Sequence, residues 1–411
     1  MDLRKIQQAI AAQDIDGWLF CDFHNREHIA YRILGLDINK SCSRRWFYFV
    51  PRRGAPVKLV HAIEQGALSA LPGKTRVYAG WEALKENLGA ILNQTGSPHP
   101  GLASLARPSP GGRGKRRVAM QYSPKNNIPT ISLVDAGTIE LVRSLGVEVV
   151  SSADLVQRLY SLVDDKRFKS HQKAGKLVQK IKDDAFALII NSLNRKKAIS
   201  ELDVQKFIMD RFEENNLTTN HGPIVAANEH AADPHFEPTA KNSKRFKKND
   251  RVLIDLWAKL KTHDAVYYDI TWCGFLGSSP PAEYVKRFQI TMNARDAAIN
   301  FVRDSLRAGK TIRGWEVDKV CRGVITDAGF GKYFVHRTGH SIDTSVHGEG
   351  ANIDSLETQD DRKLIPGALF SIEPGIYKDG IGVRSEVDVY ISLHGDVCVE
   401  GAVQQELILM R

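Results

Sequence analysis

The chain has 411 residues, of which 42% are hydrophobic and 26% charged, and its formal net charge is +9. These are ordinary globular values and the length exceeds one compact domain, so we expect two or three domains and no wholesale disorder. No apolar run reaches the roughly 18 residues of a membrane-spanning helix, and the N-terminal segment lacks the continuous apolar core of a secretion signal.

The first part of the chain alternates two kinds of segment. Short runs dense in aromatic and β-branched residues predict strands, and longer segments with an apolar stripe predict helices. Together they predict a smaller N-terminal α/β domain at residues 1–165. Its strands are expected at residues 16–23, 44–50, 56–62, 117–123 and 147–152, and its helices at residues 81–94 and 133–146.

Two stretches concentrate the positive charge. Residues 95–117, rich in Pro, Gly, Ser and Arg, predict a loop that ends in the basic run Gly111–Arg117, and Lys241–Arg251 is a second basic run. Neither run interleaves the aromatic residues on which single-stranded nucleic acid would stack. We therefore interpret both as solvated and expect no nucleic-acid partner.

The second part, residues 166–411, predicts an α+β domain with helices on a mostly antiparallel sheet. It opens with helical periodicity, including a capping-box-like helix start at Ser200–Asp203. Asp379-Gly380 is a turn signal between the last strands. Strands are expected at residues 251–258, 265–272, 368–377 and 382–392, and further helices at residues 284–306 and 315–328.

Five segments of this second part each carry an acid or a histidine among apolar residues. An ionised carboxylate is costly to bury there unless it pairs with a cation or binds a metal. One such residue would mean little, but four carboxylates with one imidazole suit two divalent ions. Two such ions can share a water, lower its pKa and polarise a carbonyl group. The residues are Asp255, Asp269, His340, Glu373 and Glu386.

The five cysteines are scattered without CxxC pairing, and their odd number argues against a disulfide framework. The simplest interpretation is a reduced, cytoplasmic protein. Cys273 follows Asp269 closely enough to approach a metal, but a small buried residue is the better interpretation.

These segments resemble the pita-bread metallopeptidases, which include methionine aminopeptidase, Xaa-Pro aminopeptidase and prolidase. LIDLWA and YDIT are similar to the two aspartate strands of that family, GHSI to its histidine turn, and SIEPGIY and GVRSE to its two glutamate segments. The resemblance covers roughly Asp165 to Arg411. The first part resembles the creatinase/prolidase-type N-terminal domain, which methionine aminopeptidases lack.

The resemblance implies a pita-bread catalytic domain that holds two metal ions. Asp255 would hold one ion, and Asp269 and Glu386 would bridge both. His340 and Glu373 would hold the other ion, and Glu373 would also take the proton of the bridging water. We expect Mn(II) first because the donors are mostly oxygen, with Zn, Co or Fe as alternatives.

Three more residues match family positions outside the metal ligands. His347, in SVHG, would contact the substrate carbonyl, and His235, in DPHF, would lie near the leaving nitrogen, where an imidazole can stabilise developing charge. Arg384 would orient Glu386 through a charge-assisted hydrogen bond. His336 matches no family role. It is expected either to pack against other side chains or to contact the residues that hold the metal ions.

The implied function is hydrolysis of Xaa-Pro peptide bonds, by a dipeptidase or an aminopeptidase, with a metal-bridging hydroxide as the nucleophile. The substrate would be a short proline-containing peptide, and the protein would be a cytoplasmic homodimer with no membrane partner. Two alternatives stay open: a creatinase-like, metal-independent amidinohydrolase, and a catalytically silent binding protein on the same fold. Retention of all the ligand residues argues against both.

The chain departs from the family pattern on the substrate side. Ser341 and Asp343 stand where the histidine turn has glycines, and we expect them to narrow the pocket. Gly348 follows His347 where many relatives have an acid. The two aspartates lie further apart than in the usual hairpin, which predicts a long turn at residues 259–265. Asp264, in that turn, is the less plausible ligand because its neighbours are polar.

Overall fold

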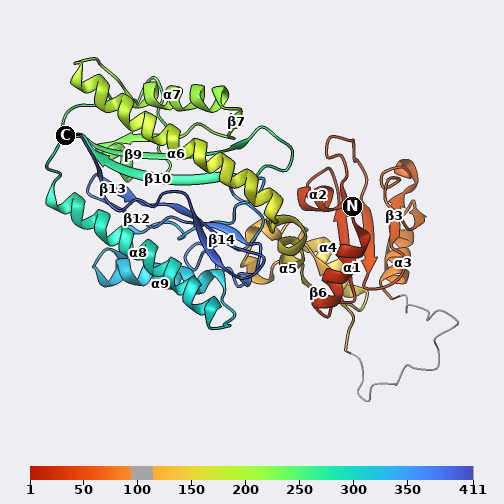
Figure 1. Ribbon diagram of the computed structural model, residues 1–411. Helices are drawn as coiled ribbons and strands as arrows, with labels where there is room; N and C mark the ends of the chain where they lie inside the picture. The colour runs from red at the N-terminus through yellow and green to blue at the C-terminus, as the bar shows by residue number, and fades with distance from the viewer. Residues whose placement is uncertain (94–113, 411) are drawn as a thin grey trace. The chain divides into compact units, whose positions relative to one another are not determined.

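The computed structural model describes residues 1–93 and 114–410, and the chain forms two compact units, residues 1–160 and 161–411 (Figure 1). The predicted loop at residues 95–117 lies almost wholly outside the described residues. Within the described residues, no helix combines the length and the apolar character that a membrane span requires.

The first unit is built on one six-stranded sheet with the order β4-β3-β2-β1-β5-β6. β1 pairs in parallel with β5 and antiparallel with β2. The chain winds outward from β1 to β4 and returns to β5 on the other side of β1, so the sheet has a topological switch point between β1 and β5. The strands are β1 (Gly17–Asp22), β2 (Trp46–Pro51), β3 (Val57–His61), β4 (Lys74–Tyr78), β5 (Arg117–Met120) and β6 (Glu148–Ser151).

Helices cover both faces of this sheet. Trp18 and Phe20 of β1 belong to the core shared with α1 and α2, whereas Leu19 and Cys21 belong to the core shared with α3 and α4. This alternation explains why β1 is buried along its whole length and reads as a continuous apolar run. The helices are α1 (Leu3–Ala12), α2 (His28–Leu34), α3 (Trp81–Leu92), α4 (Ala136–Ser144) and α5 (Ala153–Val156).

Some elements of the first unit, among them α2 and β4, were not among the predicted ones. β4 is the edge strand of the sheet, and all but the last of its residues are exposed or half-buried, so it lacks the alternation that marks a strand in a sequence. α2 is a single short helix of seven residues.

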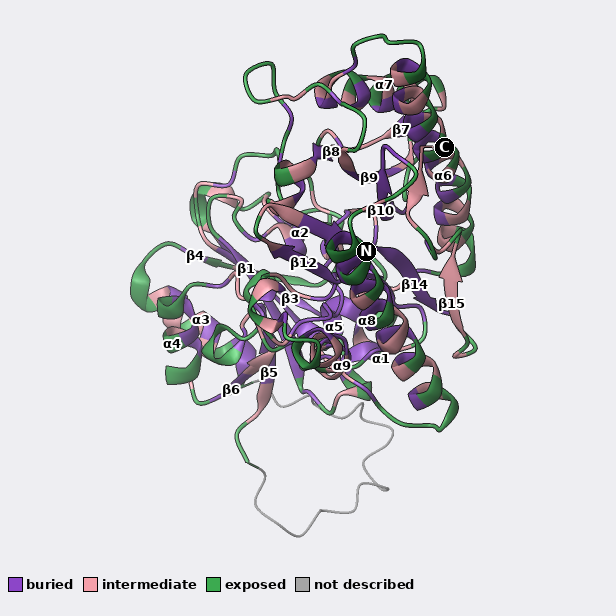
Figure 2. Cartoon of the chain, turned by 90° about the vertical axis from the view of Figure 1, so that its left-hand side faces the viewer, coloured by how far each residue is buried: buried purple, intermediate pink, exposed green. Residues whose placement is uncertain are grey.

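The second unit packs helices on largely antiparallel sheets, as predicted. α6 and α7 share a core with the sheet β16-β10-β9-β7, and α8 and α9 share another with β11 to β14. In Figure 2 the buried residues follow the strands and the inner sides of these helices. The helices are α6 (Asp165–Asn194), α7 (Glu201–Glu214), α8 (Ala282–Arg307) and α9 (Gly314–Asp327), and α7 begins with the predicted capping box at Ser200.

The two predicted C-terminal strands are each broken in two by a short gap that holds a glutamate. Glu373 and Pro374 separate β11 from β12, because proline cannot donate to a ladder, and Glu386 lies between β13 and β14. The predicted Asp379-Gly380 turn joins β12 to β13, with φ of 51° and 67°. The strands are β7 (Leu217–Thr218), β8 (Ile224–Ala227), β9 (Arg251–Leu260), β10 (Tyr268–Phe275), β11 (Leu369–Ile372), β12 (Gly375–Lys378), β13 (Ile381–Arg384), β14 (Val387–Ile391), β15 (Val397–Glu400) and β16 (Ile408–Leu409).

Candidate metal centre

Two aspartates lie on one face of the antiparallel β9–β10 pair. Asp255 stands opposite Thr271, and Asp269 precedes Thr271 by two positions on the same strand. Because alternate residues of a strand point to the same face, both carboxylates point the same way. The connection at residues 261–267 accounts for the long spacing, and Asp264 lies exposed within it, away from the site.

His340 and the two glutamates approach Asp269 from other segments. The Nε2 atom of His340 lies 3.7 Å from Oδ2 of Asp269 and 3.4 Å from Oε1 of Glu373. Asp269, His340 and Glu386 each offer a ligand atom within 4.8 Å of the others. The backbone N–H of His340 donates to Oγ of Ser371 at 3.0 Å and its carbonyl accepts from the Ser371 N–H at 2.9 Å, which ties the histidine turn to β11.

The carboxylates of this cluster fit a site for divalent cations. Asp255, Asp269 and Glu386 are each less than one tenth exposed, and Oδ1 of both aspartates is buried without a hydrogen-bond partner among the described residues. Burial, followed by repulsion from neighbouring carboxylates, raises the pKa of Asp269 and of Glu386 well above the usual range. Divalent cations would offset this charge, and the mostly oxygen donor set suits them.

Arg384 is a buried cation beside the cluster, and it forms an ion pair with Asp255. Its Nε donates to Oγ1 of Thr271 at 3.0 Å, and that hydroxyl donates to Oε2 of Glu386 at 2.7 Å. Arg384 therefore reaches Glu386 through Thr271, where the sequence predicted a direct bond. Thr271 stands between them because it lies opposite Asp255 in the sheet register. The sequence signal that could have identified Thr271 is its position two residues after Asp269, on the same face of the strand.

His336 supports the site through Tyr377, another residue that sequence reasoning missed. Nδ1 of His336 lies 2.7 Å from the Arg337 carbonyl and acts as a donor, so Nε2 accepts from the Tyr377 hydroxyl at 2.8 Å. The same hydroxyl accepts from Arg384 at 3.1 Å. Burial, reinforced by the charge of Arg384, lowers the pKa of His336 to about 3, which keeps the imidazole neutral. A chain of hydrogen bonds thus links His336 to the partner of Asp255.

All eight residues predicted for the site line one cleft of about 450 Å³ in the second unit. The ring of His347 meets that of His340 edge-on, with centroids 4.3 Å apart. His347 and His235 are both exposed. Arg337, which was not predicted, lines the same cleft. The eight are His235, Asp255, Asp269, His340, His347, Glu373, Arg384 and Glu386.

The three departures from the family pattern form one structural unit. Oγ of Ser341 accepts the Gly350 N–H at 3.1 Å, and the buried carboxylate of Asp343 accepts the Ser345 N–H at 2.7 Å. Neither Ser341 nor Asp343 lines the cleft, so they do not narrow it as expected. A Cβ at Gly348 would lie 2.7 Å from Oδ2 of Asp343, and this explains why an acid has no room there.

The model of metallopeptidase family M24 matches residues 169–392. The probable dipeptidase PepE of Mycobacterium tuberculosis is 27% identical over 289 residues, which are 70% of this chain and 71% of that one. The Xaa-Pro dipeptidase of Lactobacillus delbrueckii subsp. lactis is 31% identical over 216 residues, 52% of this chain and 53% of its own.

Among solved structures, dipeptidase PepE from Mycobacterium ulcerans has a TM-score of 0.66 and 21% identity, covering 99% of this chain and 96% of that one. A likeness at that identity shows the fold. The expected fold class, a pita-bread α+β domain preceded by a smaller α/β domain, is confirmed.

Proposed function

From the premise that this chain belongs to metallopeptidase family M24, we propose that it hydrolyses the peptide bond before proline at a centre of two divalent metal ions. The observation that carries the proposal is the convergence of four carboxylates and His340 in one cleft. The Xaa-Pro preference rests on the relative from Lactobacillus delbrueckii, which bears the name Xaa-Pro dipeptidase.

Five side chains would hold the metal ions, for which we propose Mn(II). Asp255 would bind one ion through Oδ1, because its other oxygen pairs with Arg384. Asp269 and Glu386 would bridge both ions, and His340 and Glu373 would bind the second. When bound, two such ions activate a water and polarise the substrate carbonyl.

The surrounding residues would orient the ligands and handle protons. Glu373, held by a 3.2 Å hydrogen bond from Oγ of Ser371, would accept the proton of the attacking water. His347, beside His340, would donate to the carbonyl oxygen, and His235 would act near the leaving nitrogen. Arg384 would keep Asp255 ionised and in place through their ion pair.

We propose a dipeptide as the substrate. Arg337 lines the cleft half-buried, and its guanidinium has no ion pair and no hydrogen bond within the described residues. Dipeptides carry a free carboxylate immediately after the scissile bond, and a guanidinium is the side chain that matches a carboxylate in two hydrogen bonds. We therefore favour a dipeptidase over an aminopeptidase.

The test combines metal analysis with hydrolysis of Ala-Pro and Ala-Pro-Ala. We expect bound divalent metal and metal-stimulated cleavage, with both a metal ion and activity lost in His340→Ala. His263→Ala is the matched control, because His263 is 93% exposed in the β9–β10 connection. A metal-free protein that cleaves neither peptide would refute the proposal, and metal-independent hydrolysis of creatine would establish the amidinohydrolase alternative.

We further propose a cytoplasmic homodimer with a creatinase/prolidase-type domain at residues 1–165. All five cysteines are unpaired, which suits a reducing compartment. Light scattering on the purified protein would test the dimer.

A further inference from the structure

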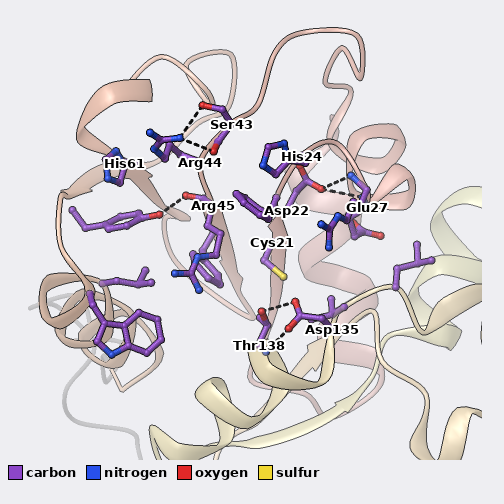
Figure 3. Close-up of a pocket in the computed structure, with 18 of the residues that line it drawn as sticks. Cys21, Asp22, His24, Glu27, Ser43, Arg44, Arg45, His61, Asp135 and Thr138 are labelled. Atoms are coloured by element: carbon purple, nitrogen blue, oxygen red, sulfur yellow. Dashed lines mark hydrogen bonds between the residues drawn. The ribbon is translucent and has the colours of Figure 1, made fainter.

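A second cleft, of about 720 Å³, lies wholly within the first unit (Figure 3). Cys21 and Asp22 at the carboxyl end of β1 line it, together with His61 and Tyr78 at the ends of β3 and β4. These strand ends meet at one edge of the sheet, next to the switch point between β1 and β5. Open α/β sheets bind ligands at this place, and nothing in the peptidase proposal uses it.

Two acidic side chains of this cleft, Asp22 and Asp135, already accept hydrogen bonds from other groups of the protein. Asp22 accepts hydrogen bonds from three backbone N–H groups at 2.8 to 3.0 Å and from the Tyr31 hydroxyl at 3.0 Å. Asp135 caps α4 by accepting from both the N–H and the hydroxyl of Thr138, each at 2.8 Å. Figure 3 shows Asp135 and Thr138 turned toward each other. These carboxylates therefore stabilise the walls of the cleft, and few of their oxygen atoms remain to bind a cationic ligand.

The basic side chains, in contrast, keep their donors available. Within the described residues, the guanidinium of Arg45 forms no hydrogen bond and no ion pair. It lies 5.3 Å from the centroid of the Trp81 ring, and its positive charge helps to keep the Asp135 carboxylate ionised. The guanidinium of Arg44 donates to its neighbour Ser43 alone. α3 begins beside them at Gly80, which has no side chain to cap the first amides of the helix.

This combination of open donors and aromatic surface defines the ligand. Two guanidinium groups and an uncapped helix N-terminus favour a phosphate. Trp81, which is 51% exposed, offers a surface for a planar ring. The volume lies in the range of roughly 300–1,000 Å³ that holds small ligands. We propose that this cleft binds a mononucleotide, with its phosphate at Arg44 and Arg45 and its base against the aromatic lining.

Calorimetric titration of the full-length, metal-free protein with AMP, adenosine and inorganic phosphate tests the proposal. Chelation beforehand removes metal ions as an alternative phosphate site. We expect saturable binding of AMP, with adenosine and phosphate each at least 10-fold weaker because each supplies half of the recognition. Arg45→Met should weaken AMP binding at least 10-fold. Arg53→Met is the matched control, because Arg53 is exposed just beyond the opposite end of β2.

Three outcomes would overturn the proposal. The first is no saturable AMP binding, and the second is equal weakening by Arg45→Met and Arg53→Met, which would place the ligand elsewhere. The third is phosphate binding as strong as that of AMP, which would reduce the cleft to an unspecific anion site. Arg45→Met should unfold at the same urea concentration as the unmodified protein, which shows that the variant is folded.

Discussion

Two arginines line the same cleft, and their charges are used differently. Arg384 is buried, pairs with Asp255 and donates to Thr271 and Tyr377, so the protein itself uses its charge. Arg337 lies half-buried on the cleft wall with no partner for its guanidinium within the described residues, so its charge is available to a substrate. The distinction depends on the burial and geometry of each side chain, since the residue type is identical.

Arg337→Met should therefore change substrate preference and leave catalysis largely intact. We expect KM for Ala-Pro to rise about 10- to 100-fold, the equivalent of one charge-assisted hydrogen bond, while KM for Ala-Pro amide stays unchanged. Arg307→Met, at the exposed end of α8, is the control. An equal effect on the acid and the amide would show that Arg337 does not bind the carboxylate.

His171 of α6 gives a pH-dependent stability. Its Nδ1 donates to the Tyr267 carbonyl at 2.6 Å, and burial lowers its pKa to about 4. The unfolded chain binds a proton near pH 6.5 whereas the folded chain resists it, so stability is full above that pH and falls toward pH 4.

Lowering the pH from 7 to 5 should reduce the free energy of unfolding by about 2 kcal/mol because of His171. His171→Asn keeps a donor for the Tyr267 carbonyl but does not titrate, so its stability should fall less over the same range in urea denaturation. Asp388 lies 3.8 Å from Nε2 of His171, and burial raises the pKa of Asp388 well above normal. A fall as steep in the variant as in the unmodified protein would show that His171 is not the source of the pH dependence.

At the level of elements, interruptions of regular structure carry the site. Glu373 and Glu386 each occupy a gap between two strands, where a side chain is freed from strict alternation and turns into the cleft. Asp255 and Asp269, by contrast, obey the alternation of an unbroken pair. The tight β12–β13 turn at Asp379-Gly380 holds the two broken strands side by side.

Two glycines of the second unit should respond to alanine with opposite signs. Gly380 has a φ of 67°, so Gly380→Ala should destabilise the protein by about 1 kcal/mol or more. Gly323 lies inside α9, with no atom within 4 Å of an added Cβ, so Gly323→Ala should stabilise it by about 0.5–1 kcal/mol. Urea denaturation of both variants provides the measurement, and effects of the same sign would contradict this account.

The molecule as a whole divides its apolar cores between its two units, and the candidate metal centre belongs to the second alone. The clustered carboxylates destabilise the second unit by repulsion unless cations are bound. A ligand that binds the folded state stabilises it in proportion to the logarithm of its concentration over its dissociation constant.

Removal of metal by a chelator should therefore loosen the second unit selectively. We expect faster amide hydrogen exchange in β9 and β10, by a factor that corresponds to about 3 kcal/mol for a site occupied at 100 times its Kd. Exchange in β1 and β5 serves as the internal control and should not change. Equal acceleration in both units, or none in either, would argue against a metal centre confined to residues 161–411.

Local patterns in the sequence predicted most of the elements and the set of residues at the site. Runs dense in aromatic and β-branched residues identified β1, β9 and β10, helical stripes identified α3 and α7, and the dipeptide Asp379-Gly380 identified a turn. The five proposed ligands were found because acids and a histidine stood out against apolar neighbours. Such signals are visible in one sequence because they depend on residues that are close along the chain.

Only the tertiary structure decided which groups contact one another. Thr271 lies between Arg384 and Glu386, and Tyr377 joins His336 to Arg384 through hydrogen bonds. Position 348 holds a glycine because a Cβ there would meet the carboxylate of Asp343. The same holds for the cleft in the first unit, whose lining comes from the ends of several strands. Hydrogen bonds and steric contacts act over a few ångströms between residues far apart in sequence, so local pattern cannot specify them. The sequence by itself determined the fold class and the chemistry of the donors, and tertiary packing decided their partners.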